Sequence, residues 1–141
     1  MKRMIQIILI ISMLTMGILP AYATGTVEPE PIIVKPMWSH VNQFNNSFSI
    51  TPAGMADIES TLYAFEVDVI EIKVDLQQFK NGSWVTIKSW TETTDYVVCK
   101  LVGKWYVVKG YGYRMVATGR VYIGGQMVEE VSFSSRVIYY D

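Results

Sequence analysis

Apolar and polar side chains alternate without interruption from residue 70 to residue 77, and this pattern restricts the fold more than any other feature of the chain. The even positions carry aliphatic side chains and the odd positions carry charged or amide groups: Ile70, Ile72, Val74 and Leu76 against Glu71, Lys73, Asp75 and Gln77. A period of two places one set on a buried strand face and the other toward solvent. A helix would spread the aliphatic side chains around its circumference, so the pattern predicts a half-buried β-strand.

Residues 56–65 repeat this alternation, although their alanine and glutamate residues leave a helix as the alternative. The positions predicted to point inward are small or aliphatic: Ala56, Ile58, Ser60 and Leu62. A first strand is predicted at 47–52, and residues 91–110 predict one long strand or two short strands around Gly103. No proline follows Pro52, which favours uninterrupted sheet hydrogen bonding.

Strand patterns without helical ones are typical of an all-β fold. We expect a single antiparallel β-sandwich of about seven strands, with a small closed barrel as the alternative. The expected organisation is a signal peptide at 1–23, an extended proline-containing linker at 24–37 and the β-sandwich domain at 38–141.

Asn81-Gly82 is the strongest short hairpin signal in the chain, because a type I′ turn requires positive φ at both of its central residues. This two-residue loop predicts a register for the flanking strands. On the inner face, the predicted pairs are Leu76 with Ile87, Gln78 with Val85 and Val74 with Ser89. On the outer face, they are Asp75 with Lys88, Lys73 with Trp90 and Phe79 with Trp84. Three aromatic rings and two lysines are therefore predicted on the outer face, with Lys73 opposite Trp90.

Gly124-Gly125 predicts a second hairpin. A two-residue loop there would set Gly119 opposite Glu130 and leave Val131 and Phe133 outside the core. We prefer a three-residue loop that begins at Ile123 and ends in a bulge, because it shifts the parity by one. The pairs predicted by this loop are Met115 with Phe133, Ala117 with Val131, Val121 with Met127 and Gly119 with Glu129.

The N-terminal stretch has the order of a secretory signal peptide. Lys2 and Arg3 precede an apolar run of 16 residues at 4–19, and Ala21-Tyr22-Ala23 supplies a small-residue cleavage pattern. The run is shorter than the roughly 20 residues of a membrane-spanning helix. We expect cleavage after Ala23 and a secreted, extracellular protein, with an uncleaved N-terminal anchor as the alternative.

Charge and cysteine content exclude several classes of protein. Without residues 1–23 the chain has ten basic and thirteen acidic side chains, hence a formal charge of −3. The basic residues are scattered, so neither nucleic acid nor an anionic membrane surface is an expected partner. Cys99 is the single cysteine, so no disulfide can form within the chain. Its apolar neighbours predict a buried structural thiol, with pairing between chains as the alternative.

The chain is poor in residues for metal or nucleophilic chemistry. His40 is the single histidine, which excludes the usual zinc sites, and we expect it at a surface or strand edge. Two groups of carboxylates are candidate sites. The candidate calcium ligands are Glu66, Asp68 and Glu71, and the candidate paired acids for glycoside hydrolysis are Glu59, Asp75, Glu129 and Glu130. We expect these carboxylates to be solvated, and we expect no cofactor, metal or catalytic residue.

The segment YGYRM at 111–115 is similar to the tyrosine corner of immunoglobulin-like domains, in which a tyrosine bonds back to the chain and a cysteine follows two residues later. Tyr113 would be the corner tyrosine, while Met115 stands in the cysteine position. This resemblance implies that the expected fold is a single immunoglobulin-like antiparallel β-sandwich of about seven strands. The segments LQQFKNGSWVTIKSW and GYGYRMVATGRVYIGGQMVEE also resemble the recurring segments of an uncharacterised group of small secreted proteins from Gram-positive bacteria. This resemblance covers residues 55–140 and implies an exported β-sandwich-like domain, with no functional residues to carry over.

The aromatic outer face is the remaining functional signal. Exposed rings on a sheet can stack on sugars or anchor a protein interface. Packing across strands, or coverage by residues 29–37, is the structural alternative. We expect a secreted non-catalytic binding module for a cell-wall glycan or a protein partner. The alternatives are a small secreted hydrolase that uses carboxylates and a toxin-like or antimicrobial protein. The candidate binding residues are Phe79, Trp84, Trp90 and Lys73, and the residues with structural roles are Asn81, Gly82, Tyr113, Gly124 and Gly125.

Overall fold

The computed structural model describes residues 39–141, which form eight β-strands and no helix. The strands are β1 (Val41–Ile50), β2 (Met55–Ala64), β3 (Val69–Lys80), β4 (Ser83–Thr94), β5 (Val98–Tyr106), β6 (Tyr111–Ile123), β7 (Gln126–Ser134) and β8 (Ile138–Tyr140). The predicted signal peptide at 1–23 and the predicted linker at 24–37 lie outside the described residues.

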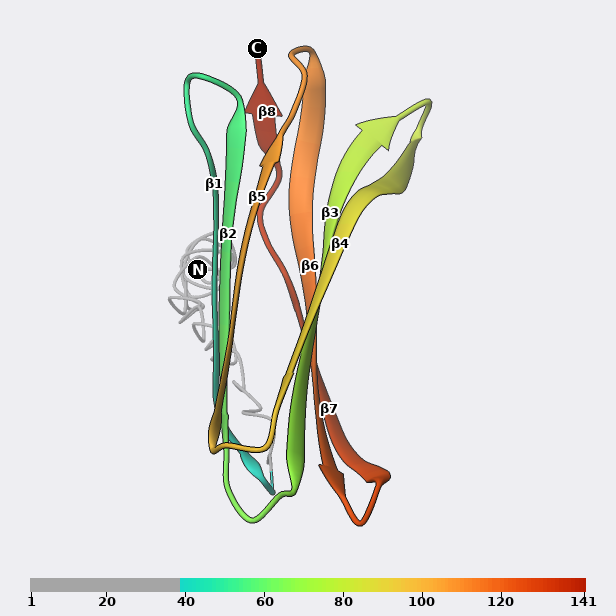
Figure 1. Cartoon of the computed structure of the whole chain (residues 1–141). Helices are drawn as coiled ribbons and strands as arrows, with labels where there is room; N and C mark the ends of the chain where they lie inside the picture. Colours follow the sequence, from blue (N-terminus) through green and yellow to red (C-terminus); the bar gives the residue numbers. More distant parts are fainter. Residues whose placement is uncertain (1–38) are drawn as a thin grey trace, which may run out of the picture. The chain divides into compact units, whose positions relative to one another are not determined.

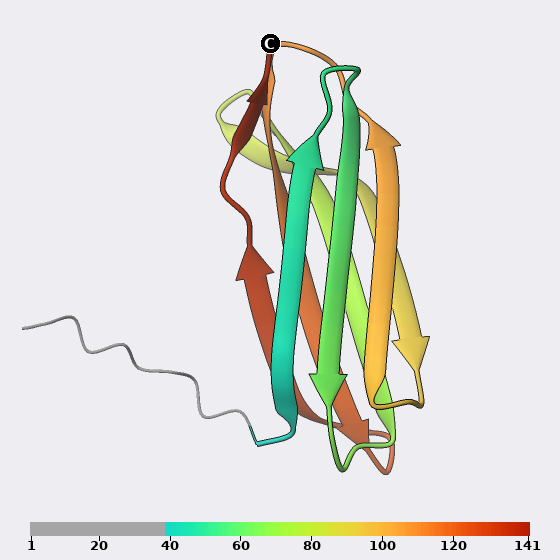
Figure 2. The same cartoon turned by 90° about the vertical axis from the view of Figure 1, so that its left-hand side faces the viewer.

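The strands form two antiparallel sheets. The small sheet has the order β1-β2-β5, and the large sheet has the order β4-β3-β6-β7, with β8 paired to the start of β6. Figure 1 shows the sheets as two layers, and Figure 2 shows the small sheet in front of the large one. The prediction of an all-β sandwich is confirmed. The barrel alternative is wrong, because no ladder in the described part of the chain joins the two sheets.

The core lies between the inner faces of the two sheets. The alternating positions of β2 and β3 are buried as predicted, with exposed fractions of 2% or less: Ala56, Ile58, Ser60, Leu62, Ile70, Ile72, Val74 and Leu76. Each fully buried aliphatic side chain stabilises the fold by about 1.5–3 kcal/mol. The helical alternative for 56–65 is wrong, because β2 pairs with β1 on one side and with β5 on the other.

The first hairpin has the predicted turn but only part of the predicted register. Asn81 and Gly82 have φ values of 52° and 79°, and Phe79 lies opposite Trp84 as expected. Beyond Gln77 a β-bulge at Ile87 shifts the ladder by one residue. The observed pairs after the bulge differ from the predicted ones: Leu76 with Lys88, Asp75 with Ser89, Val74 with Trp90 and Lys73 with Thr91.

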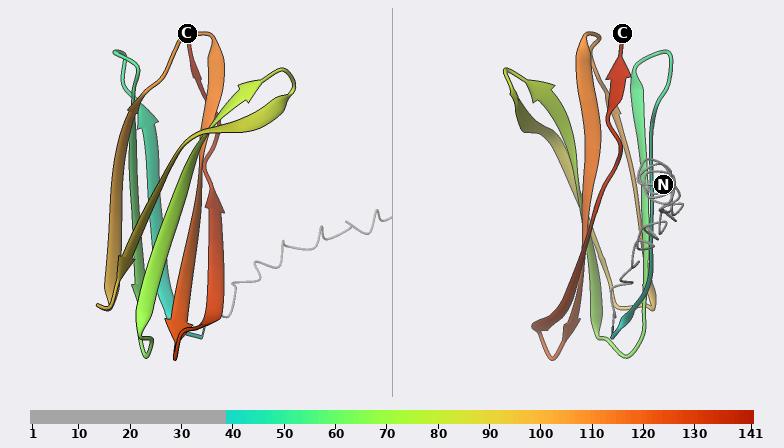
Figure 3. Two further views of the ribbon diagram at one scale, coloured as in Figure 1. Left: turned by 45° about the vertical axis from the view of Figure 1, so that its right-hand side comes forward. Right: turned by 180° about the vertical axis from the view of Figure 1, so that it is seen from behind.

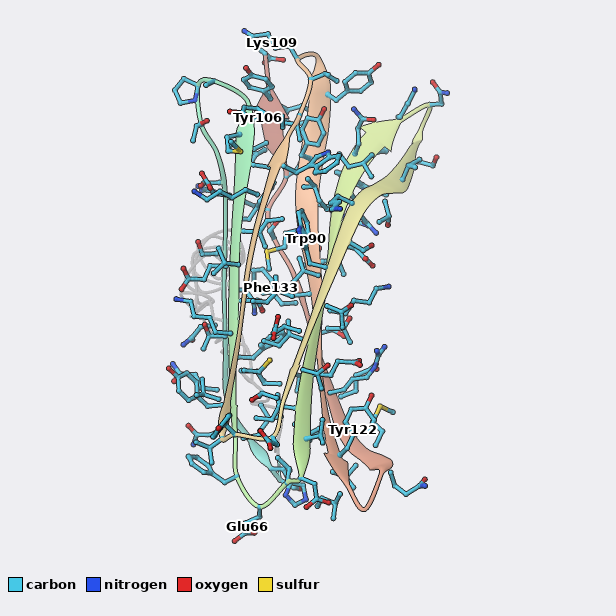
Figure 4. The ribbon with its side chains drawn as sticks, viewed as in Figure 1. Glu66, Trp90, Tyr106, Lys109, Tyr122 and Phe133 are labelled. Atoms are coloured by element: carbon cyan, nitrogen blue, oxygen red, sulfur yellow. The ribbon has the colours of Figure 1, made fainter. Side chains whose placement is uncertain are left out.

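The bulge moves Trp90 to the inner face of β4, so its predicted position on the outer face is wrong. Trp90 packs against the core, and Figure 4 shows it between the two sheets. Its ring lies over Gly103 of β5, where a Cβ atom would approach the ring carbon Cε2 to 2.8 Å. Residues 98–106 form one continuous strand through Gly103, and the glycine leaves the space that the indole ring occupies.

The second hairpin corrects the predicted three-residue loop. Gly124 and Gly125 have φ values of 57° and 77° and form a two-residue loop, with Ile123 opposite Gln126. A bulge at Val128 then moves each later β7 partner one residue toward the C-terminus, whereas the predicted three-residue loop moved it one residue toward the N-terminus. The observed pairs are Val121 with Glu129, Arg120 with Glu130, Gly119 with Val131 and Ala117 with Phe133. Val131 and Phe133 still point inward, because the predicted and observed registers have the same parity.

Cys99 lies on the inner face of β5 and is buried, as predicted. Its thiol donates a 3.6 Å hydrogen bond to the carbonyl oxygen of Glu92. Burial, helped by the negative charge of Glu92, raises the pKa of the Cys99 thiol to about 11. The thiol therefore stays protonated at neutral pH.

Candidate aromatic binding face

Four cross-strand partners form a row across the large sheet near the turn of the first hairpin. Trp84 of β4 lies opposite Phe79 of β3, Phe79 opposite Gly112 of β6, and Gly112 opposite Tyr139 of β8. Phe79 shares the outer face of β3 with Lys73 and Asp75, because side chains two residues apart lie on one face of a strand. The row therefore lies on the face of the large sheet that points away from the small sheet.

The aromatic side chains in this row contact one another and the sheet beneath them. The ring centroids of Phe79 and Trp84 are 5.2 Å apart, and the ring planes are inclined by 56°. A Cβ atom on Gly112 would lie 3.1 Å from both the Tyr139 ring and the Val137 side chain. Tyr139 and Val137 therefore cover the backbone of Gly112 directly, which a larger residue at this position would prevent.

Arg114 lies in the next row and joins this cluster. Its guanidinium carbon is 4.2 Å from the centre of the Trp84 ring, a cation–π contact. Its Nε donates a 2.8 Å hydrogen bond to Oε1 of Gln77, and the Gln77 amide donates a 3.4 Å hydrogen bond to Thr86. These contacts hold the plane of the guanidinium group. We call the set Trp84, Phe79, Arg114, Val137 and Tyr139 the aromatic face.

The aromatic face is accessible to solvent within the described part of the chain. Phe79 is 42% exposed, Tyr139 is 71% exposed and Val137 is 38% exposed. Figure 3 shows that the ends of β3 and β4 bend away from the small sheet, so this hairpin stands clear of the other layer. Large apolar side chains gathered on one exposed face are typical of binding surfaces.

The structure brings two of the four predicted binding residues together. Phe79 and Trp84 belong to the aromatic face, whereas Trp90 lies between the sheets. Lys73 lies on the outer face but six residues along β3 from Phe79, and its Nζ forms a 3.4 Å ion pair with Asp75. In place of the predicted pairing with Lys73, Trp90 has the Nζ of Lys88 at 5.9 Å from its ring centre.

The sequence patterns did not predict Tyr139 and Arg114 as site residues. The alternation along β6 would place Arg114 on the outer face, because its neighbour Tyr113 was expected to point into the fold. Nothing in the pattern of 136–141 indicates that Tyr139 lies beside Gly112, since a three-residue strand is too short to show a period.

Tyr113 is fully buried at the start of β6. Its hydroxyl donates a 2.7 Å hydrogen bond to the carbonyl oxygen of Val108, five residues upstream, and accepts a 2.9 Å hydrogen bond from the Gln78 amide. This is the backward bond that the tyrosine-corner pattern predicts. It fixes the chain where it crosses from β5 in the small sheet to β6 in the large sheet.

The four acids that were candidates for a hydrolytic pair form contacts with different groups of the chain. Glu59 pairs with Lys100 at 2.9 Å, Asp75 accepts a hydrogen bond from Ser89, and Glu130 pairs with Arg120 at 2.7 Å. Glu129 was expected opposite Gly119, but its carboxylate accepts backbone hydrogen bonds at the start of β1. The donors are the N–H groups of Ser39, His40 and Val41.

The three carboxylates that were weighed as candidate calcium ligands do not converge either. Asp68 accepts a 2.6 Å hydrogen bond from the backbone of Gly124, and Glu71 pairs with Arg120 at 3.0 Å. Glu66 occupies a turn with a φ of 58°. Residues 39–141 contain no group of three or more side chains placed to hold a metal ion. His40 is half-buried at the start of β1.

A shallow hollow of about 280 Å³ lies on the outer face of the small sheet. It includes Asp57 and Lys104, which form a 3.3 Å ion pair, and Glu59, which pairs with Lys100. Charges that neutralise one another across this hollow leave little to attract a charged ligand. The aromatic face is the better candidate for a binding site.

No protein-family model matches the chain, and no curated protein is significantly similar to it. The predicted resemblance to secreted proteins of Gram-positive bacteria therefore stays a prediction. Residues 39–141 include no helix with the length and apolar character needed to cross a membrane. The described residues define a β-sandwich with an aromatic cluster on the outer face of one sheet.

Proposed function

We propose that the protein is a secreted, non-catalytic binding module that uses the aromatic face to bind cell-wall glycans. The observation that carries this proposal is the row Trp84, Phe79 and Tyr139 across four strands, with Arg114 stacked on Trp84. Neighbouring strands lie about 4.8 Å apart, so the row spans roughly 14 Å. A short run of linked sugar rings has a similar length and can lay its apolar C–H faces on such rings.

The strand order supports the further proposal that the sandwich is immunoglobulin-like. Taken in chain order, β1, β2 and β5 correspond to strands A, B and E, and β3, β6 and β7 correspond to C, F and G. The bond from Tyr113 to Val108 corresponds to the tyrosine corner of strand F. The fourth strand differs from the constant-type arrangement, because β4 lies beside β3 in the large sheet.

A sequence feature supports export, and the contacts of the acidic side chains support a non-catalytic role. The charged start, apolar run and small-residue motif at 1–23 are typical of a signal peptide. The acids weighed as a hydrolytic pair, Glu59, Asp75, Glu129 and Glu130, form separate contacts with other groups of the chain. A glycosidase needs two carboxyl groups about 5–9.5 Å apart on either side of one bond.

The proposal is tested by measuring binding to a panel of purified cell-wall glycans. We expect the wild type to bind at least one member and Trp84→Ala to weaken that binding about tenfold, because aromatic stacking contributes on the order of 1–3 kcal/mol. Tyr96→Ala is the matched control, since Tyr96 is 74% exposed and lies between β4 and β5, outside the aromatic face. Absence of binding to every glycan, or equal binding by Trp84→Ala, would refute the proposal.

A further inference from the structure

Two arginines lie on the outer face of β6, Arg114 and Arg120, six residues apart and therefore on the same side of the strand. Arg120 is held by two carboxylates of the chain itself. Its Nη1 donates to Glu71 at 3.0 Å and its Nε donates to Glu130 at 2.7 Å. These hydrogen bonds raise the pKa of Arg120. The fold thus supplies Arg120 with carboxylates from both neighbouring strands.

At Arg114, no carboxylate occupies the corresponding positions: Gln77 lies on one side, and Ser135, Arg136 and Val137 follow the last β7 pair on the other. Gln77 is the cross-strand partner of Arg114 on β3, in the way that Glu71 is the partner of Arg120. On the other side, the β7 ladder ends at the pair of Val116 with Ser134, and residues 135–137 that follow carry no carboxylate. Among residues 39–141, no acidic side chain forms an ion pair with Arg114.

The guanidinium group of Arg114 is nevertheless fixed in place. It stacks on Trp84 at 4.2 Å, and its Nε is engaged by Gln77. The hydrogen bond at Nε leaves the terminal Nη groups available to a ligand. A planar guanidinium group held by stacking is well suited to bind a carboxylate through parallel hydrogen bonds, because little side-chain entropy is lost on binding.

We propose that the aromatic face selects acidic glycans, with Arg114 binding the carboxylate of a uronic-acid type of sugar while the aromatic rings stack on the sugar rings. The external carboxylate binds the terminal Nη groups of Arg114, as Glu71 binds Nη1 of Arg120. This inference rests on the proposed glycan-binding function and adds the chemical class of the ligand. It also assigns separate roles, since Trp84 and Phe79 provide affinity for any sugar ring and Arg114 provides the preference for acid.

The probes are a glucuronate-containing wall polysaccharide and the same polymer after chemical reduction of its carboxyl groups to alcohols. They share a sugar backbone and differ in the carboxylate alone. We expect the full-length wild type to bind the acidic form about three- to tenfold more tightly, the range for an exposed charge-assisted pair. Arg114→Gln should bind both forms equally, at the affinity that the wild type has for the reduced form.

Gln77→Glu provides the sharper test, because it places a carboxylate beside Arg114 as Glu71 lies beside Arg120. This variant keeps Arg114 and Trp84 but should lose the preference for the acidic polymer. Thr118→Glu is the matched control. It adds the same charge to the outer face of β6, opposite Lys73 and away from the aromatic face, and should keep the preference.

The outcomes separate this inference from the function on which it rests. Equal binding of the two polymers by the wild type, or a full preference retained by Gln77→Glu, would overturn the role of Arg114 and leave glycan binding intact. A wild type that binds neither these polymers nor any other member of the glycan panel would overturn both. Loss of the preference in Arg114→Gln and Gln77→Glu, with Thr118→Glu unchanged, would support the inference.

Discussion

At the scale of single residues, Gly103 and Trp90 depend on each other at a contact between the two sheets. A Cβ atom at position 103 would lie 2.8 Å and 2.9 Å from two carbons of the indole ring, which is too close for the ring to stay in place. We therefore expect Gly103→Ala to lower the free energy of unfolding by about 1–3 kcal/mol through overpacking. Urea denaturation of the variant and the wild type measures this difference.

A double-mutant cycle provides the control for Gly103→Ala. In a Trp90→Leu background the side chain at position 90 is smaller, so the added methyl group should cost much less. If Gly103→Ala costs the same in both backgrounds, the contact with the ring is not the cause. The sequence pattern predicted neither side of this contact, because Trp90 was expected on the outer face and Gly103 was expected either within one long strand or between two short ones.

Cys99 gives a prediction about pH. The thiol has a pKa of about 11 in the folded state, raised from 9.0 by burial and by Glu92. A raised folded-state pKa means that its contribution to stability is complete below about pH 9 and is lost as the pH rises toward 11. Between pH 8 and pH 10.5 the wild type should lose more stability than Cys99→Ala, as measured by the urea midpoint. Parallel pH profiles for the two proteins would contradict the assignment.

At the scale of elements, the two bulges mark the limit of what alternation can predict. The period of two identified the buried faces of β2 and β3, because those strands lie inside their sheets and carry apolar residues at every second position. Next to each turn, the observed pairs are those of a two-residue loop. The extra residues Ile87 and Val128 follow from how the paired strands bend over the core, and no local residue pattern predicts them.

The bulge in β4 has a consequence that can be measured, since it places the two tryptophans of one strand on opposite faces. Trp90→Ala should destabilise the fold by about 3 kcal/mol, because it removes a ring packed in the core. Trp84→Ala should cost about 1 kcal/mol, because it removes only contacts on the outer face with Phe79 and Arg114. Chemical denaturation of both variants tests this order. Equal costs would favour the predicted register, in which both rings lie outside.

At the scale of the described domain, the class of fold was predictable but the neighbours of each strand were not. Tyr139 joins the aromatic face because β8 lies beside β6, and these strands pair residues 25–29 positions apart in the chain. β8 pairs with the part of β6 that the β7 ladder leaves free, and the strand order that leaves this edge open is not visible in a local residue pattern. Two of the five residues of the aromatic face, Phe79 and Trp84, belong to one hairpin and could therefore be predicted from the sequence, whereas Tyr139 comes from β8 and could not.

The hydrogen bonds of Tyr113 tie the connection between β5 and β6 to the large sheet and yield a prediction for the domain as a whole. Tyr113→Phe removes the hydroxyl that donates to Val108 and accepts from Gln78, and leaves both partners without that bond. Because Val108 is 61% exposed, water can replace the lost partner, and we expect a loss of about 0.5–1.5 kcal/mol in unfolding free energy, the net contribution of a typical hydrogen bond. Tyr139→Phe is the matched control, since Tyr139 is 71% exposed, and should change stability by less than about 0.5 kcal/mol.

Because the bond fixes the crossing from β5 to β6, hydrogen exchange in Tyr113→Phe should rise first in residues 107–113. A uniform rise across both sheets would instead show that the hydroxyl contributes to overall stability without fixing this crossing.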